Sequence, residues 1–191
     1  MILDVGCGDR PRGTVNVDLN IGSSSHLDDR RCTAKIPNFV CADINHLPFK
    51  SNVFAKVLCW HTLEHLETPE KALRELVRVA NGTVQVVVPH RYHEKFQNFF
   101  LPTRRAWASK HHKHFFSIRQ LQELLKKTGI QGVVRCALFN KYGAAIKYYK
   151  TYKRPFLDLL LFGFVETFLP PIPGELMMTI HKTMNPTALA T

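Results

Sequence analysis

The stretch ILDVGCGD (residues 2–9) joins a short apolar run to a turn of small residues, and it decides the fold. Residues 2–5 predict a buried parallel strand, because a strand covered on both faces is continuously apolar. Gly6 and Gly8 allow a tight turn and a close approach of the backbone to a ligand. A single GxG turn is common, so its interpretation depends on the strands that follow.

Two further predicted strands also end at a carboxylate. Asp18 closes the strand at residues 14–18, and Asp43 follows the strand at residues 38–42. A carboxylate after the second strand suits a ribose diol, and one after the third suits an adenine amino group, with the ring packed on Ile44. Three such strand ends at one sheet edge predict a nucleotide-like cofactor site.

The remaining elements predict an α/β fold. Further strands are expected at residues 55–60, 83–88, 133–139 and 176–181. One helix is expected to begin after Thr68 and to end at Gly82, and another to run from a Ser117–Gln120 capping box to Gly129. We therefore expect a Rossmann-like, mostly parallel seven-stranded sheet flanked by helices. The first crossover helix should be shortened to a turn, because only residues 6–13 join the first two strands.

Net charge divides the chain of 191 residues into parts with different roles. Residues 1–90 are neutral, whereas residues 91–154 hold 15 basic and 2 acidic side chains and account for the whole excess of +11. The excess predicts an anionic partner. We interpret residues 1–191 as one domain with four parts: a cofactor-binding half (1–90), a basic substrate-side half (91–139), an insertion before the last strand (140–174), and the last strand with a tail (175–191).

Five cysteines without CxxC spacing predict reduced thiols and a cytoplasmic location. The first ten residues lack the basic and apolar regions of a secretory signal. No apolar run reaches the roughly 20 residues that a membrane-spanning helix needs.

Five stretches together resemble a known enzyme class. They are ILDVGCGD (2–9), VNVDL (15–19), CADINHLPF (41–49), VLCWHTLEHLETPEKALRELVRV (57–79) and VQVVVPH (84–90). In them the sequence resembles the class I S-adenosylmethionine-dependent methyltransferases, in the small type-11-like group. The resemblance implies S-adenosyl-L-methionine as the cofactor, held by Asp4, Gly6, Cys7, Gly8, Asp18, Leu19, Asp43, Ile44 and His61. The usual third glycine is absent, so the loop after the first strand is expected to differ from the family pattern. Ala55 also departs from that pattern, because the family usually has Asp before the fourth strand.

Histidines and arginines supply the candidates for catalysis and for acceptor binding. Methyl transfer depends mainly on positioning, and a base is needed only if the nucleophile carries a proton. We take His65 and His90 as candidate bases, since imidazole titrates near neutral pH. Arg91, His93, Arg104 and His114 are candidates for gripping a phosphate or carboxylate.

Residues 61–65 also fit HxxEH, a zinc-hydrolase pattern. His61 closes a predicted strand and the next helix begins only at Pro69, so both imidazoles would not share a helical face. Lysines flank the imidazoles of KHHKH (110–114) and oppose a dication, so this segment is expected to be solvated or to bind anions. No metal site is expected.

Three functions remain open. The first is methylation of an anionic small molecule, glycan or lipid. The second is methylation of RNA, with tyrosines among the lysines of residues 141–154 stacking on bases. The third is a non-catalytic methyltransferase-like module that binds a ligand or contacts a membrane surface through residues 141–169.

Overall fold

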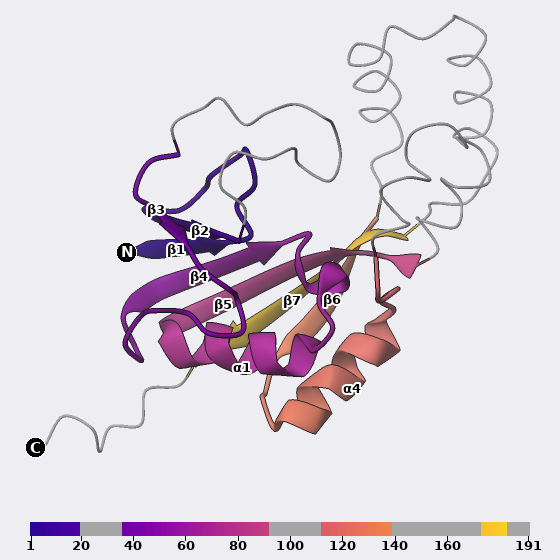
Figure 1. Ribbon diagram of the computed structural model, residues 1–191. Coiled ribbons are helices and arrows are strands. Elements are labelled where there is room, and N and C mark those ends of the chain that lie inside the picture. The colour runs from indigo at the N-terminus through magenta and orange to yellow at the C-terminus, as the bar shows by residue number, and fades with distance from the viewer. Residues whose placement is uncertain (20–35, 92–111, 139–172, 183–191) are drawn as a thin grey trace, which may run out of the picture.

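The computed structural model describes residues 1–19, 36–91, 112–138 and 173–182 (Figure 1). Seven strands form one sheet in the order β3-β2-β1-β4-β5-β7-β6. They are β1 (Ile2–Val5), β2 (Val15–Asp18), β3 (Phe39–Cys41), β4 (Phe54–Trp60), β5 (Ala80–Pro89), β6 (Val133–Leu138) and β7 (Pro173–His181). The first five pair in parallel, and β7 runs antiparallel between β5 and β6. The predicted seven-stranded, mostly parallel sheet is confirmed.

Two helices, α1 (Pro69–Val79) and α4 (Ile118–Thr128), lie next to each other on one face of the sheet (Figure 1). Their apolar stripes are buried against it through Leu73 and Leu76 of α1 and Leu121 of α4. Arg74 of α1 donates to the carbonyl of Thr128 at 3.0 Å and joins the helices at their polar side. The predicted capping box at Ser117 is present, and Gly129 ends α4 in the left-handed conformation.

The predicted end of α1 at Gly82 is wrong. The helix ends at Val79, and Ala80 is already extended and pairs with Phe54 as the first residue of β5. A Cβ on Gly82 would lie 2.4 Å from the carbonyl oxygen of Ala55. Gly82 therefore serves the close approach of β4 and β5, and sheet pairing ends the helix. Thr68 occupies the predicted N-cap position, but its side chain makes no capping hydrogen bond.

The connection between β1 and β2 contains no helix, as predicted. Two buried polar side chains hold this turn. Asp4 accepts a hydrogen bond from the Arg12 amide at 2.8 Å, and Asn16 accepts one from the Gly13 amide at 2.9 Å. Asn16 also donates to the carbonyl of Pro37 at 2.7 Å, which ties β2 to the segment before β3.

Residues 140–172 of the predicted insertion (140–174) lie outside the described residues, and its last two residues belong to β7, which begins at Pro173, three residues before the expected strand. The cysteines that the structure describes, at positions 7, 41, 59 and 136, are all free thiols. Within the described ranges, no helix combines the length and the apolar character needed to cross a membrane.

Candidate functional site

The loop after β1 folds back onto the end of β2. Gly6 and Gly8 have positive φ values of 72° and 52°. The amides of Gly6 and Cys7 donate to the carbonyl of Val17 at 2.8 and 3.1 Å, and the amide of Gly8 donates to Asp18 Oδ2 at 2.9 Å. In a fold with a helix after β1, the amides of this turn would be available to bind a ligand at the helix N-terminus. Here the amides of Gly6, Cys7 and Gly8 are all bound to β2 instead.

Gly6 also lies against the loop that follows β4. A Cβ at this position would come within 2.0 Å of Thr62 Oγ1, so any side chain would require Thr62 to move. Gly8 has open space around it and is exposed. The two glycines thus differ: both have a backbone conformation that favours glycine, but only Gly6 is also required for packing.

Asp4 presents a buried carboxylate with an incomplete set of hydrogen bonds. Oδ2 accepts from the Arg12 amide, but Oδ1 has no hydrogen-bond partner among the described residues. Burial raises the pKa of Asp4, although the Arg12 amide works in the opposite direction. A buried unpaired oxygen costs stability unless a donor satisfies it, and an ammonium group is such a donor. Asp4 therefore fits the methionine end of the expected cofactor.

The ends of β2 and β3 place the other expected cofactor residues differently. Leu19 is 64% exposed beside Asp18, as a surface that packs on a ligand should be. Ile44 is 6% exposed and belongs to the core. Asp43 is exposed, and its carboxylate accepts from the amide of Asn45 at 2.8 Å. This backbone hydrogen bond lowers the pKa of Asp43. Cys7 is buried.

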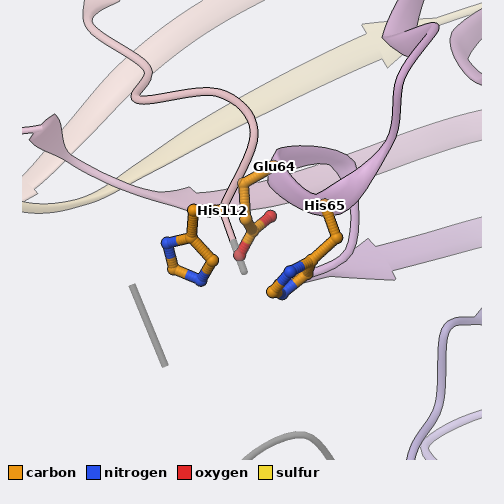
Figure 2. Close-up of side chains that lie close together, drawn as sticks. All are labelled: Glu64, His65 and His112. Carbon is orange, nitrogen blue, oxygen red and sulfur yellow. The ribbon is translucent and has the colours of Figure 1, made fainter. Parts of the chain in front are cut away.

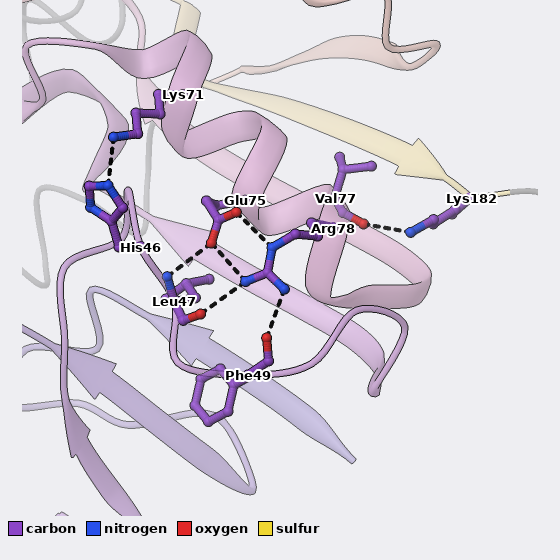
Figure 3. A network of polar contacts seen from close by, with 8 residues as sticks. All are labelled: His46, Leu47, Phe49, Lys71, Glu75, Val77, Arg78 and Lys182. Carbon is purple, nitrogen blue, oxygen red and sulfur yellow. Dashed lines mark hydrogen bonds and ion pairs between the residues drawn. The ribbon is translucent and has the colours of Figure 1, made fainter.

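A network of polar contacts fixes the loop that carries Asp43 (Figure 3). Glu75 of α1 accepts from the amide of Leu47 at 3.0 Å. Arg78 holds the same carboxylate through Nε at 2.7 Å and donates to the carbonyls of Leu47 and Phe49 at 2.9 and 2.7 Å. The backbone of the loop after β3 is therefore held by two side chains of α1, Glu75 and Arg78.

Sequence reasoning missed a contact between the β1–β2 turn and β4. The guanidinium of Arg12 lies 4.4 Å from the ring centroid of Trp60, the last residue of β4. Trp60 Nε1 is buried and has no hydrogen-bond partner in the described part of the chain. The abundance of arginine near the GxG turn was visible in the sequence, but the partner depends on the pairing of β1 with β4.

His61, expected near the cofactor, lies between two carboxylates. Its Nε2 is 3.1 Å from Glu175 of β7, and its Nδ1 is 3.7 Å from Glu64. Burial lowers the pKa of His61, but the hydrogen bond to Glu175, the contact with Glu64 and the charges of both carboxylates outweigh burial and raise the pKa to about 9. His61 also has a φ of 52°, so the chain turns sharply where β4 ends.

The expected acceptor-side residues gather at the end of β5 where they are described. His90 is 5% exposed, and its amide donates to the carbonyl of Gly174 at 3.1 Å. The amide of Arg91 donates to the carbonyl of Phe116 at 2.8 Å. His114 stacks on the ring of Phe116 at 5.7 Å. Burial lowers the pKa of His90, and the Arg91 charge adds to this effect, so its imidazole is neutral near pH 7. His93 and Arg104 lie outside the described residues, as do residues 141–169, on which the RNA and membrane hypotheses depend.

His65 forms a cluster that the sequence did not predict. The short 3-10 helix η1 (Leu63–His65) places Glu64 and His65 beside His112, and the three side chains point toward a common space (Figure 2). One ligand atom from each lies within 4.8 Å of the others. The rings of His65 and His112 meet edge to face, with centroids 4.6 Å apart. Only the fold brings the EHL and KHHKH stretches together.

The sheet order and the turns at its carboxyl edge define a class I methyltransferase fold. Residues 3–87 match the family model Methyltransf_11, described as a methyltransferase domain. This match covers somewhat under half of the chain and, together with the fold, supports a class I S-adenosylmethionine-dependent methyltransferase of the type-11-like group, with S-adenosylmethionine as the cofactor consistent with it.

Three comparisons show what the chain is similar to. An uncharacterized protein of Methanocaldococcus jannaschii is 34% identical over 97 residues, which make up 46% of this chain and 39% of that protein. The chain thus spans well under two thirds of this relative. The plantazolicin methyltransferase BpumL, solved with a desmethylPZN analog and SAH, superposes with a TM-score of 0.60 and 16% identity, over 95% of this chain and 75% of that one. The [4+2]-cyclase SpnF superposes with a TM-score of 0.55 and 16% identity, over 96% and 75% of the two chains. At these identities the two structures show the fold alone.

Proposed function

We propose that this chain binds S-adenosylmethionine at the carboxyl ends of β1 and β2 and transfers its methyl group to an anionic small molecule, glycan or lipid. The observation that carries the proposal is Asp4, whose buried Oδ1 lacks a hydrogen-bond partner in the described structure, directly before the Gly6–Gly8 turn. A cofactor ammonium would complete its hydrogen bonds.

Further residues of the same edge would hold the rest of the cofactor. Asp18 ends β2 with a carboxylate suited to ribose hydroxyls, and the exposed Leu19 beside it offers an apolar surface to the adenosine. The amides of residues 6–8 are already bound to β2, so a different group must hold the carboxylate of the methionine end. Arg12, over Trp60, is the cation nearest in sequence to that turn with a fixed position. We assign it this role.

The acceptor side follows from the end of β5. His90 is neutral near pH 7 and can therefore accept a proton from an acceptor hydroxyl or amine. Arg91, whose amide is bonded to the carbonyl of Phe116, supplies positive charge for an anionic acceptor, and the imidazole of His114, stacked on Phe116, offers a hydrogen-bonding group. Arg104 and His93 belong to the same proposal on sequence grounds. Free cysteines at all described positions also support a reducing, cytoplasmic location.

Calorimetric titration with S-adenosylhomocysteine tests the cofactor site. We expect Asp18→Ala to weaken binding by about 10- to 100-fold, the equivalent of a lost charge-assisted hydrogen bond. Asp18 also holds the Gly8 amide, so a second variant is needed, and Leu19→Glu changes an exposed side chain without touching that bond. The matched control is Asp9→Ala, because Asp9 is exposed and pairs only loosely with Arg10 at 3.9 Å. Wild-type affinity in both Asp18→Ala and Leu19→Glu would reject the site.

A non-catalytic binding module is the second candidate, and the occupied amides of residues 6–8 favour it, because they depart from the expected cofactor loop. Transfer of a labelled methyl group to a panel of phosphorylated and carboxylated acceptors separates the two. Cofactor binding without turnover on any acceptor class would support the module. Labelled product that depends on His90 would support the enzyme.

A further inference from the structure

We propose that Glu64, His65 and His112 form a binding site for a divalent transition-metal ion of the Zn²⁺ type, whose open coordination positions hold an oxygen of the methyl acceptor. The metal site stands on its own geometry, and its role toward the acceptor rests on the proposed methyltransferase function. The two parts are therefore tested separately.

The three side chains come from two segments that the fold holds together. Lys113 and His114 donate their amides to the backbone carbonyl of Glu64 at 2.8 and 3.1 Å, and this pairing sets His112 beside η1. One ligand atom of each residue lies within 4.8 Å of the others (Figure 2). Two atoms bonded to one zinc ion at about 2.1 Å are at most about 4.2 Å apart. Binding therefore requires the three side chains to close by roughly half an ångström or more.

Glu64 is the observation that points to a cation. Its side chain is 1% exposed, and neither carboxylate oxygen has a hydrogen-bond partner in the part of the chain that is described. His61 Nδ1 forms a long ion pair with Oε1 at 3.7 Å, which is beyond hydrogen-bond distance, so both carboxylate oxygens still lack a hydrogen bond among the described residues. A buried carboxylate without hydrogen bonds is costly, and metal coordination removes that cost. A metal ion between Glu64 and the two imidazoles would satisfy it directly.

The lysine beside His112 does not oppose such an ion. The ammonium group of Lys113 forms an ion pair with Glu67, at the surface. This ion pair balances the charge of the lysine at the surface. The sequence suggested that lysines flanking the imidazoles would repel a dication. In the structure, the described one of them is neutralised by a carboxylate of its own.

The ligand set indicates the kind of ion. Two imidazoles and one carboxylate suit Zn²⁺, Fe²⁺ or Co²⁺, whereas Mg²⁺ and Ca²⁺ prefer oxygen ligands alone. Three protein ligands also leave coordination positions open, as in catalytic rather than structural zinc sites. The cluster lies on the turn after β4, at the sheet edge where the acceptor is expected, so an acceptor bearing a hydroxyl or carboxylate oxygen fits the open position.

Metal binding is tested on the full chain after removal of metal by a chelator. We expect Zn²⁺ at about 100 times its Kd to raise the Tm by roughly 5–10 °C. Titration with Co²⁺ should produce a visible absorption band that reaches its maximum at one equivalent of Co²⁺ per chain. Glu64→Gln and His112→Ala should lose both responses while keeping a cooperative transition, because Glu64→Gln removes a buried charge without changing the shape of the side chain. His181→Ala, an exposed histidine at the end of β7, is the control and should respond as the wild type.

The outcomes separate the metal site from the cofactor site. Absence of a Zn²⁺-dependent Tm shift in the wild type, or an equal shift in Glu64→Gln and His112→Ala, overturns the metal proposal even if S-adenosylhomocysteine still binds. A Zn²⁺ response lost in both variants supports the metal site even if S-adenosylhomocysteine does not bind. The acceptor role predicts that the Co²⁺ spectrum changes when a methylatable hydroxy or carboxy acceptor is added, and an unchanged spectrum with a turned-over acceptor overturns that role.

Discussion

Replacement of Arg78 by methionine should destabilise the protein more than its position on a surface helix suggests. The guanidinium makes four hydrogen bonds, two to Glu75 and one each to the carbonyls of Leu47 and Phe49, all between 2.7 and 2.9 Å (Figure 3). Methionine keeps the apolar stem of the side chain and removes every donor. Glu75 then keeps the amide of Leu47 as its partner in this network.

The size of the loss follows from these contacts. Hydrogen bonds to charged groups contribute about 1.5–3 kcal/mol each when buried, but the Arg78 side chain is 34% exposed, so water replaces part of them. We expect a net loss of about 2–3 kcal/mol, which lowers the Tm of a chain of this size by roughly 4–12 °C. Arg119→Met is the matched control, since Arg119 is 88% exposed and its ion pair is with Glu123, one turn further along α4. An exposed pair of this kind contributes at most about 0.5 kcal/mol.

Thermal unfolding followed by circular dichroism measures both variants under identical buffer conditions. The expected result is a clear drop for Arg78→Met and a shift near zero for Arg119→Met. Equal shifts in the two would refute the reasoning, because they would mean that the loop after β3 is not held by α1. A drop in Arg78→Met that vanishes in a Glu75→Gln background would identify the carboxylate as the main partner.

Other predictions concern glycines and pH. Gly6→Ala should lower the Tm clearly more than Gly8→Ala. Both positions have a positive φ, but a Cβ at Gly6 would clash with Thr62 at 2.0 Å, whereas a Cβ at Gly8 would meet open space. Similar Tm values for the two variants would contradict this. The bond from Arg78 lowers the pKa of Glu75 below its usual 4.5, so this pair stabilises the fold above that pH and its contribution disappears as pH falls through the folded pKa; Glu75→Gln should flatten the acid limb of stability against pH. Burial lowers the pKa of His90 below 6.5, so protonation favours the unfolded state as pH falls below 6.5. His90→Gln should therefore lose less stability between pH 6.5 and 5.5 than the wild type.

Much of the described fold was predictable from local patterns. Continuous apolar runs gave the strands, and the capping box at Ser117 with Gly129 gave both ends of α4. The absent first crossover helix followed from the chain length between β1 and β2. The end of α1 was not predictable in this way, since Gly82 is a general helix-stop signal and only the register of Phe54 with Ala80 shows that the strand begins earlier.

The candidate site likewise has features that the sequence predicted and features that only the tertiary structure shows. The sequence by itself indicated the class of the protein, because Asp4 and Asp18 lie at the ends of their strands, Gly6 and Gly8 come directly after β1, and parallel strands align their carboxyl ends. It also located the positive charge in the middle third of the chain. The tertiary structure decided that the amides of residues 6–8 bind to β2, that His61 lies between Glu64 and Glu175, and that His112 meets His65. These contacts join residues up to 114 positions apart, and only the folded register of the sheet and the path of residues 112–116 across η1 bring them together.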